Sequence, residues 1–297
     1  MYRSIDWTEL RAALLKDGAL VLPDFLDRAT IDDIQREIDP WCRQVNFNEI
    51  YGSTILGANR WLHHLGIVSL SAVRLALDEK VLELMESVFG EPAILTQVSY
   101  QEKIRPDPNH LKMHSDFDGG IFVFYYLSGV DEEIGATRYL PGTHEIGGTL
   151  QTRDTVFIDA ALYEPRMADL KVASGGPGTV MFFDQDIWHD LPPVTKAGRR
   201  VLTCCYQPQS RTECAYDHLY RQSILAQLTE RQRHAFGIGQ PPFQRAGRLS
   251  WVGFPLSLEH VKFALRYFLR HRYIARRTPA GKPPITRHRP ERIRAKV

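Results

Sequence analysis

The chain has 297 residues, of which 43% are hydrophobic and 24% are charged, with a formal net charge of +2. These values are ordinary for a globular protein, and they exclude the collagen, coiled-coil and wholly disordered classes. No apolar run approaches the roughly 20 residues that a membrane-spanning helix needs, and the N-terminus lacks the apolar core of a secretory signal. Four scattered cysteines form neither a disulfide framework nor a paired zinc motif, so we expect a cytoplasmic protein.

The N-terminal third is predicted to be mainly helical. Asp6 can cap a first helix, which ends at Gly18, and a short buried strand follows over residues 19–22. Apolar residues at helical spacing predict further helices over residues 30–38 and 69–89, the second range holding one helix or two.

From about residue 94 to residue 207 the pattern changes to short β-rich runs separated by Gly, Pro and Asp turns. This is typical of a sandwich or barrel rather than of alternating βαβ units. We expect strands over residues 94–104, 113–116, 122–127, 137–140, 179–183 and 200–207. Helical patterns return over residues 219–236 and 258–275, so the predicted fold class is mainly β with flanking helices (α+β).

Basic charge is concentrated at the C-terminus. Residues 262–297 contain 12 Lys and Arg against one Glu, which leaves 25 basic and 34 acidic residues in the rest of the chain. We predict a single domain over residues 1–261, followed by a basic amphipathic helix and a flexible tail. Residues 262–277 could contact an anionic membrane peripherally, dock on the acidic body or cover an anionic substrate. Nucleic acid is not expected as a partner, because no stacking or base-reading motif accompanies the charge.

A candidate metal site lies in the β region, at His114-Ser115-Asp116. Residues two apart in a strand project to one face, so this imidazole and carboxylate converge. His189 follows the strand predicted at 179–183 and supplies a second imidazole. Two histidines and one carboxylate form the facial triad of non-haem Fe(II) sites, which leaves other coordination positions open. A closed zinc site that adds His110 is an alternative, although no thiolate lies nearby.

An arginine stands at the start of the strand predicted at 200–207. A buried guanidinium needs an anionic partner, and its planar fork matches a carboxylate. Arg200 is our candidate and Arg199 its rival, because strand alternation lets only one of them point inward. A dicarboxylate with one end on the metal and the other on this arginine would satisfy both groups.

Taken in order, these segments resemble the phytanoyl-CoA dioxygenase (PhyH-like) family of Fe(II)/2-oxoglutarate-dependent oxygenases, over about residues 8–207. The segments that carry the resemblance are Lys16-Asp17-Gly18-Ala19-Leu20-Val21-Leu22-Pro23, His114-Ser115-Asp116, Leu140-Pro141-Gly142-Thr143-His144, Gly178, Phe182-Phe183, His189 and Arg200. The chain departs from the family at Ile134-Gly135, where members often carry Asn-Gly, and near Phe124, where they carry Trp.

The resemblance implies a double-stranded β-helix (jelly-roll) core, with Fe(II), 2-oxoglutarate and O2 as cofactor and cosubstrates. It implies that His114, Asp116 and His189 bind the metal. It implies that Arg200 anchors 2-oxoglutarate, with Gln101 or its rival Gln97 near this cosubstrate. The implied reaction is hydroxylation of an aliphatic C–H bond in a small-molecule or lipid-like substrate, with release of succinate and CO2. Asp116 favours oxygenation over chlorination, since related halogenases carry a small residue there.

Two other functional classes stay open on the sequence. One is a cupin-like metal-binding protein or isomerase without oxygenase activity. The other is a membrane- or RNA-associated module with a vestigial site, in which the basic tail is the functional part. Lys103, Arg105 and Lys112 precede the triad and could meet an anionic group, so an anionic substrate is one option. Nothing in the sequence predicts an oligomeric state.

Overall fold

The structure is a computed structural model, and it describes residues 5–43, 54–116, 120–147, 157–210 and 222–237. The chain divides into two units, Met1–Pro255 and Leu256–Val297, and every described residue belongs to the first. The basic helix and tail predicted over 262–297 lie outside the described residues, so the boundary at residue 261 stays a prediction. Within the described ranges, no helix is long and apolar enough to cross a membrane.

Five helices belong to the N-terminal part of the fold. They are α1 (Trp7–Asp17), α2 (Arg28–Cys42), α3 (Leu65–Val68), α4 (Leu70–Ala76) and α5 (Glu79–Phe89). Asp6, Asp27 and Asp78 cap α1, α2 and α5, each by accepting backbone hydrogen bonds from the first turn. Gly18 ends α1 in the left-handed region, as predicted, with a φ of 72°. The helical pattern over 69–89 is two helices, because Asp78 starts a new one.

The described strands form two antiparallel sheets. The large sheet has the order β1 (Ala19–Leu22), β9 (Val180–Asp184), β6 (Ile121–Tyr126), β11 (Arg200–Pro208), β4 (Ala93–Lys103), β3 (Asn59–Leu62) and β2 (Thr54–Leu56). The small sheet has the order β5 (Leu111–His114), β10 (His189–Leu191), β7 (Arg138–Tyr139) and β8 (Lys171–Val172). Together with the flanking helices, they confirm the predicted α+β fold with a jelly-roll core.

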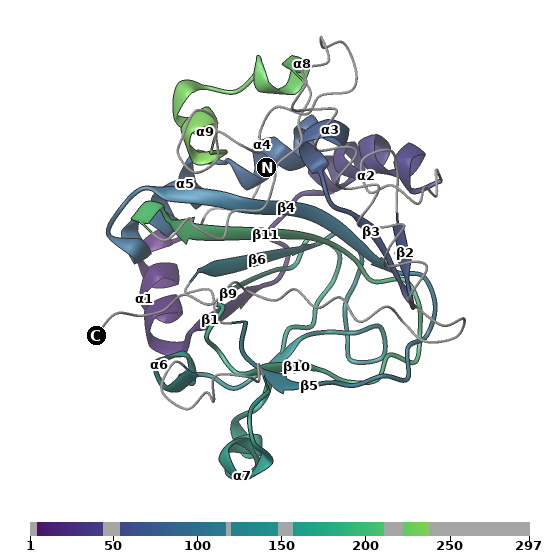
Figure 1. The fold of residues 1–297 in the computed structure, drawn as a ribbon, viewed down its shortest axis with the longest axis vertical. Coiled ribbons are helices and arrows are strands. Elements are labelled where there is room, and N and C mark those ends of the chain that lie inside the picture. Colours follow the sequence, from purple (N-terminus) through teal and green to yellow (C-terminus); the bar gives the residue numbers. More distant parts are fainter. Residues whose placement is uncertain (1–4, 44–53, 117–119, 148–156, 211–221, 238–297) are drawn as a thin grey trace, which may run out of the picture. The chain divides into compact units, whose positions relative to one another are not determined.

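The large sheet buries both of its faces, with helices on one side and the small sheet on the other (Figure 1). Leu202, Cys204 and Tyr206 of β11 pack with the helices in the main hydrophobic core. Val201 points the other way and packs in a second core with Tyr139 of the small sheet. Because neighbouring strand residues point to opposite faces, β11 separates the helical layer from the space between the sheets.

Several short elements escape sequence prediction. The strands β2, β3, β8 and β10 have four residues or fewer, which is too short for a clear alternation. The helix predicted over 219–236 is interrupted, and residues 219–221 lie outside the description. The remaining elements are α6 (His144–Gly147), α7 (Ala160–Tyr163), the 3-10 helix η1 (Glu164–Asp169), α8 (Gln222–Leu225) and α9 (Glu230–Ala235).

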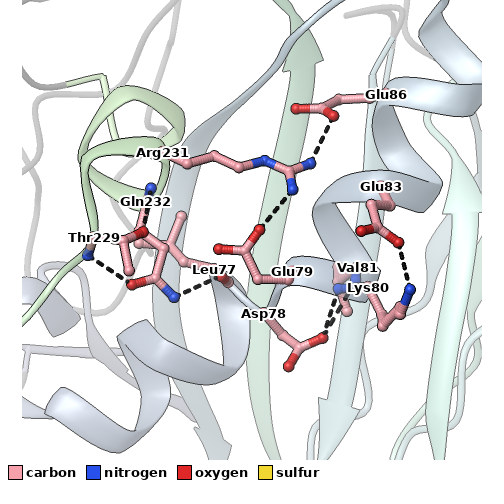
Figure 2. A network of polar contacts seen from close by, with 10 residues as sticks. All are labelled: Leu77, Asp78, Glu79, Lys80, Val81, Glu83, Glu86, Thr229, Arg231 and Gln232. Atoms are coloured by element: carbon pink, nitrogen blue, oxygen red, sulfur yellow. Dashed lines mark hydrogen bonds and ion pairs between the residues drawn. The ribbon is translucent and has the colours of Figure 1, made fainter.

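The last described helix, α9, docks on the helical layer (Figure 2). It starts with a capping box, in which Thr229 and Gln232 exchange hydrogen bonds. The Arg231 guanidinium bridges Glu79 and Glu86 of α5, with N–O distances of 2.6 and 2.8 Å. Gln232 also donates to a backbone carbonyl just after α4. The described residues 222–237 therefore pack on the same fold as the two sheets.

Candidate metal centre

Two histidines face each other across neighbouring strands of the small sheet. His114 ends β5, His189 begins β10, and the two are direct cross-strand partners with ring centroids 4.2 Å apart. The Nδ1 atom of each ring bonds the backbone carbonyl two residues earlier, at 2.8 Å for His114 and 2.9 Å for His189. Since a carbonyl oxygen only accepts, each Nδ1 carries the proton and each Nε2 keeps its lone pair for a metal.

Asp116 joins the two histidines from a position beyond the strand. The strand predicted over residues 113–116 would include Asp116, but β5 ends at His114. The Asp116 N–H donates to the Gln185 carbonyl at 2.8 Å, which holds the loop in place. Its carboxylate oxygens lie 3.7 Å from His114 Nε2 and 3.4 Å from His189 Nε2. One potential ligand atom from each of His114, Asp116 and His189 lies within 4.8 Å of the others. Among the described residues, this cluster could hold a metal ion.

The cluster is closed on its histidine side and open on its carboxylate side. The side chains of His114 and His189 are 7% and 9% exposed, whereas that of Asp116 is 31% exposed. Two imidazole nitrogens and one carboxylate are the donor set of the non-haem Fe(II) facial triad, so the residues fit such an ion. The exposed side leaves room for further ligands.

The protonation states of His114 and Asp116 suit a bound cation. Burial, reinforced by the neighbouring imidazole, lowers the pKa of His114 to about 4. Burial also lowers the pKa of His189, but the Asp116 carboxylate outweighs it and raises this pKa above its ordinary value. For Asp116, burial raises the pKa, and the two imidazoles outweigh it and lower the pKa. At neutral pH His114 is therefore neutral and Asp116 is an anion, as metal binding requires. Asp116 favours a proton on His189, and a metal ion would have to displace that proton.

Of the two candidate arginines, Arg199 points toward the space between the sheets. It is 4% exposed, and its Nη1 and Nη2 atoms donate to the Gly135 carbonyl and to Gln101 Oε1, both at 2.7 Å. Its Nε atom is buried without a hydrogen-bond partner, and no described carboxylate pairs with it. Burial lowers the pKa of Arg199. A buried guanidinium with neutral partners and a spare donor is suited to bind an anion.

Arg200, the candidate favoured by the sequence analysis, points instead toward the helical layer. Its guanidinium forms an ion pair with Asp39 of α2, and its Nε donates to the Tyr100 hydroxyl at 2.7 Å. Burial lowers the pKa of Arg200, but Tyr100 and Asp39 outweigh it and raise this pKa. Arg200 thus has an anionic partner within the protein, and the structure does not bring it to the triad. It shares its side of β11 with Leu202, which packs against the helices.

The two candidate glutamines lie on the inner face of β4. Gln101 pairs with Val201 of β11 and accepts the hydrogen bond from Arg199. Gln97 donates to Ser99 Oγ at 2.8 Å, on the same face. Gln101 therefore contacts the candidate anion-binding arginine directly, and Gln97 does not.

Other residues weighed in the sequence analysis have partners away from the triad. His110 Nε2 bonds Asp190 at 2.9 Å, so the described residues offer no fourth ligand for the closed zinc alternative. Lys103 is buried in an ion pair with Asp107 at 2.7 Å and has no exposed ammonium to offer a substrate. His144 Nε2 bonds the Leu15 carbonyl at 3.2 Å, away from the triad.

Sequence reasoning missed two residues beside the site. Thr143 is fully buried; its hydroxyl donates to the Leu140 carbonyl at 2.7 Å and accepts from the Trp188 N–H, one residue before His189, at 2.9 Å. The Leu-Pro-Gly-Thr-His motif indicated the segment but not this contact. Phe157 lies beside His114, with ring centroids 6.2 Å apart, and no pattern in its own segment indicates this position.

Comparisons with known proteins agree with this geometry. The family described as phytanoyl-CoA dioxygenase (PhyH) matches residues 14–201, which is more than half of the chain. No curated protein matches the chain significantly.

Solved structures show the same fold at low sequence identity. The epimerase SnoN in complex with Fe3+, alpha ketoglutarate and nogalamycin RO has a TM-score of 0.55 at 17% identity, covering 68% of this chain and 84% of that chain. HygX from Streptomyces hygroscopicus with nickel, 2-oxoglutarate and hygromycin B bound has a TM-score of 0.52 at 17% identity, covering 69% and 88%. At such identities, the likeness is evidence of fold alone.

Proposed function

The chain belongs to the phytanoyl-CoA dioxygenase family of Fe(II)/2-oxoglutarate-dependent oxygenases, and from this premise we propose that it hydroxylates an aliphatic C–H bond of a small molecule. In that reaction one atom of O2 enters the substrate, and the other enters the succinate that forms when 2-oxoglutarate loses CO2. The observation that carries the proposal is the convergence of His114, Asp116 and His189.

We assign metal binding to these three residues. Bound Fe(II), with 2-oxoglutarate and O2, supplies the oxidising chemistry that breaks the C–H bond. The chain fixes both imidazole rings through their Nδ1–carbonyl hydrogen bonds, which leaves each Nε2 free to coordinate. Asp116 provides the negative charge, and its exposed side is where the cosubstrates enter in this proposal.

We assign the 2-oxoglutarate anchor to Arg199 rather than to Arg200. Arg199 has a spare Nε donor and neutral partners, so a ligand carboxylate supplies the counter-charge that this buried guanidinium lacks. Gln101 holds the guanidinium in place and lies near the cosubstrate. Gln97 is a further polar contact on the same sheet face.

The substrate in this proposal is a small molecule. SnoN and HygX were solved with nogalamycin RO and hygromycin B, and both of these ligands are small molecules. The basic charge of residues 262–277 supports a more specific version of this proposal. In that version the substrate is lipid-like, and these residues contact an anionic membrane peripherally.

Two adjacent arginines provide a matched test of the site. With Fe(II)-loaded protein, we expect Arg199→Lys to raise the KM for 2-oxoglutarate in O2-dependent succinate formation about tenfold or more. The reason is that a bidentate, charge-assisted contact contributes about 1.5–3 kcal/mol. The control Arg200→Lys should leave this KM unchanged, because its guanidinium binds Asp39.

His189→Ala should abolish succinate formation and Co(II) binding together. The anchor assignment is refuted if Arg200→Lys raises the KM and Arg199→Lys does not. The oxygenase proposal is refuted if the wild-type chain binds Co(II) yet forms no succinate. A substrate-derived product whose mass does not increase by one oxygen atom contradicts hydroxylation.

A further inference from the structure

Phe157 is an exposed aromatic residue directly beside the candidate metal centre. Its backbone forms an antiparallel bridge with His114, so the two side chains point to the same face. The Phe157 ring stands edge-on to the imidazole, at an interplanar angle of 62°. In spite of this contact, Phe157 is 51% exposed, so much of its apolar surface faces solvent.

Aromatic rings also lie on the other side of the histidine pair. The Phe183 ring packs against His189 with centroids 5.3 Å apart. Phe122 and Phe124 pack on Phe183 at 5.5 and 4.9 Å, and both are only partly buried. Apolar rings therefore pack against both histidines of the proposed metal site.

The strands around the site carry no acidic group that a cationic substrate could use. Strand register places Trp61, Gln101, Ser99 and Thr203 on the inner face of the large sheet, and none of them carries a carboxylate. The same register leaves no aspartate or glutamate on the inner faces of the described strands. Asp116 lies beyond β5, and a bound metal ion would neutralise its charge. A substrate with several positive charges would therefore find no counter-charge on these strand faces.

We propose that Phe157 is a specificity-determining residue, against which the substrate lays an apolar ring that carries no positive charge. The proposal rests on the proposed function, because it takes the triad as the reaction centre. Ring stacking and the burial of exposed apolar surface both favour such a contact. Phe157 is also one of six exposed large hydrophobic residues of the described chain, four of which lie on β5 or on residues 157–169: Leu111, Phe157, Leu162 and Met167.

The test uses 8-anilinonaphthalene-1-sulfonate, a fluorescent probe with apolar rings and one negative charge. The full chain, loaded with Co(II) and 2-oxoglutarate, is titrated with the probe. We expect a saturable site that Phe157→Ser weakens about tenfold, equivalent to about 1.4 kcal/mol, and that Phe157→Tyr restores. Leu15→Ser is the matched control, because Leu15 is exposed to 41% but lies on α1. We expect it to bind the probe as the wild type does.

Each other outcome overturns the proposal. The first is that the wild-type chain shows no saturable probe site. The second is that Phe157→Ser weakens probe binding less than about fivefold, or that Leu15→Ser weakens it equally. The third is that hygromycin B, a polycationic competitor, displaces the probe. Binding of Co(II) and 2-oxoglutarate to the wild-type chain is measured in parallel by calorimetry. Failure there refutes the proposed function, whereas a failed probe titration with intact Co(II) binding refutes the role of Phe157 alone.

Discussion

Replacement of Thr143 by valine tests whether the loop that carries it holds the strand of His189 in place. The Thr143 hydroxyl donates to the Leu140 carbonyl at 2.7 Å and accepts from the Trp188 N–H at 2.9 Å. Valine keeps the shape of threonine but offers no hydrogen bond. The buried Trp188 N–H then loses a partner, and an unsatisfied buried backbone group costs about 1–3 kcal/mol. With the loss at Leu140 added, we expect Thr143→Val to lower the free energy of unfolding by about 2–4 kcal/mol.

The position of Trp188 gives this variant a second measurable effect. Trp188 directly precedes His189, so the loosened backbone should also weaken Co(II) binding, which calorimetry measures alongside urea unfolding. Thr143→Ser keeps the hydroxyl and loses one methyl group, and we expect it to cost about 1 kcal/mol and to bind Co(II) as the wild type does. The reasoning is wrong if Thr143→Val unfolds within about 0.5 kcal/mol of Thr143→Ser and binds Co(II) equally well.

Three further changes test other parts of the fold. Gly178→Ala should lower the free energy of unfolding in urea by at least about 2 kcal/mol, because the φ of Gly178 is +91° and a Cβ would lie 2.6 Å from the Leu26 carbonyl oxygen. The control Gly57→Ala has nothing within 4 Å of its Cβ and should cost only its backbone strain of about 1 kcal/mol. Equal losses in the two variants would contradict this. Asp107→Asn should lower the free energy of unfolding by about 3 kcal/mol, because it leaves the buried Lys103 ammonium without a counter-charge. The control Glu133→Gln breaks an exposed ion pair and should cost under about 1 kcal/mol. A larger loss in Glu133→Gln than in Asp107→Asn would refute this reasoning. The hydrogen bonds from Thr30 lower the pKa of Asp27 from 3.8 to about 2, so the stability that this carboxylate contributes is present above about pH 4 and is lost as the pH falls through about 2. Asp27→Asn should therefore reduce the slope of the unfolding free energy against pH in that range. An unchanged slope would exclude the Asp27 cap as its source.

The convergence of His114, Asp116 and His189 is easier to predict from the sequence than the surroundings of this cluster, for a physical reason. His114, Asp116 and His189 are chemically distinctive, and few arrangements other than a metal site suit them. The choice between Arg199 and Arg200 depends instead on which face of β11 each side chain occupies. Because both faces of β11 are buried, its residues show no polar–apolar alternation that would identify the inner face.

Contacts between distant segments limit prediction in the same way. Nothing near Phe157 in the sequence indicates that its backbone bridges His114. The role of Thr143 depends on a hydrogen bond to a residue 45 positions later. The helices, in contrast, have local caps such as Asp6 and Gly18, and these were predictable because a cap acts within one turn.

The place of β11 in the large sheet has a consequence for the order of assembly during synthesis. β11 lies between β6 and β4, so the half made of β1, β9 and β6 joins the half made of β4, β3 and β2 only through it. Until the ribosome has released residues 200–208, the nascent chain therefore presents two unpaired apolar sheet edges. Such edges invite association with other chains, and pairings this distant in sequence form slowly. We expect the nascent chain to be most vulnerable to aggregation just before this central strand inserts.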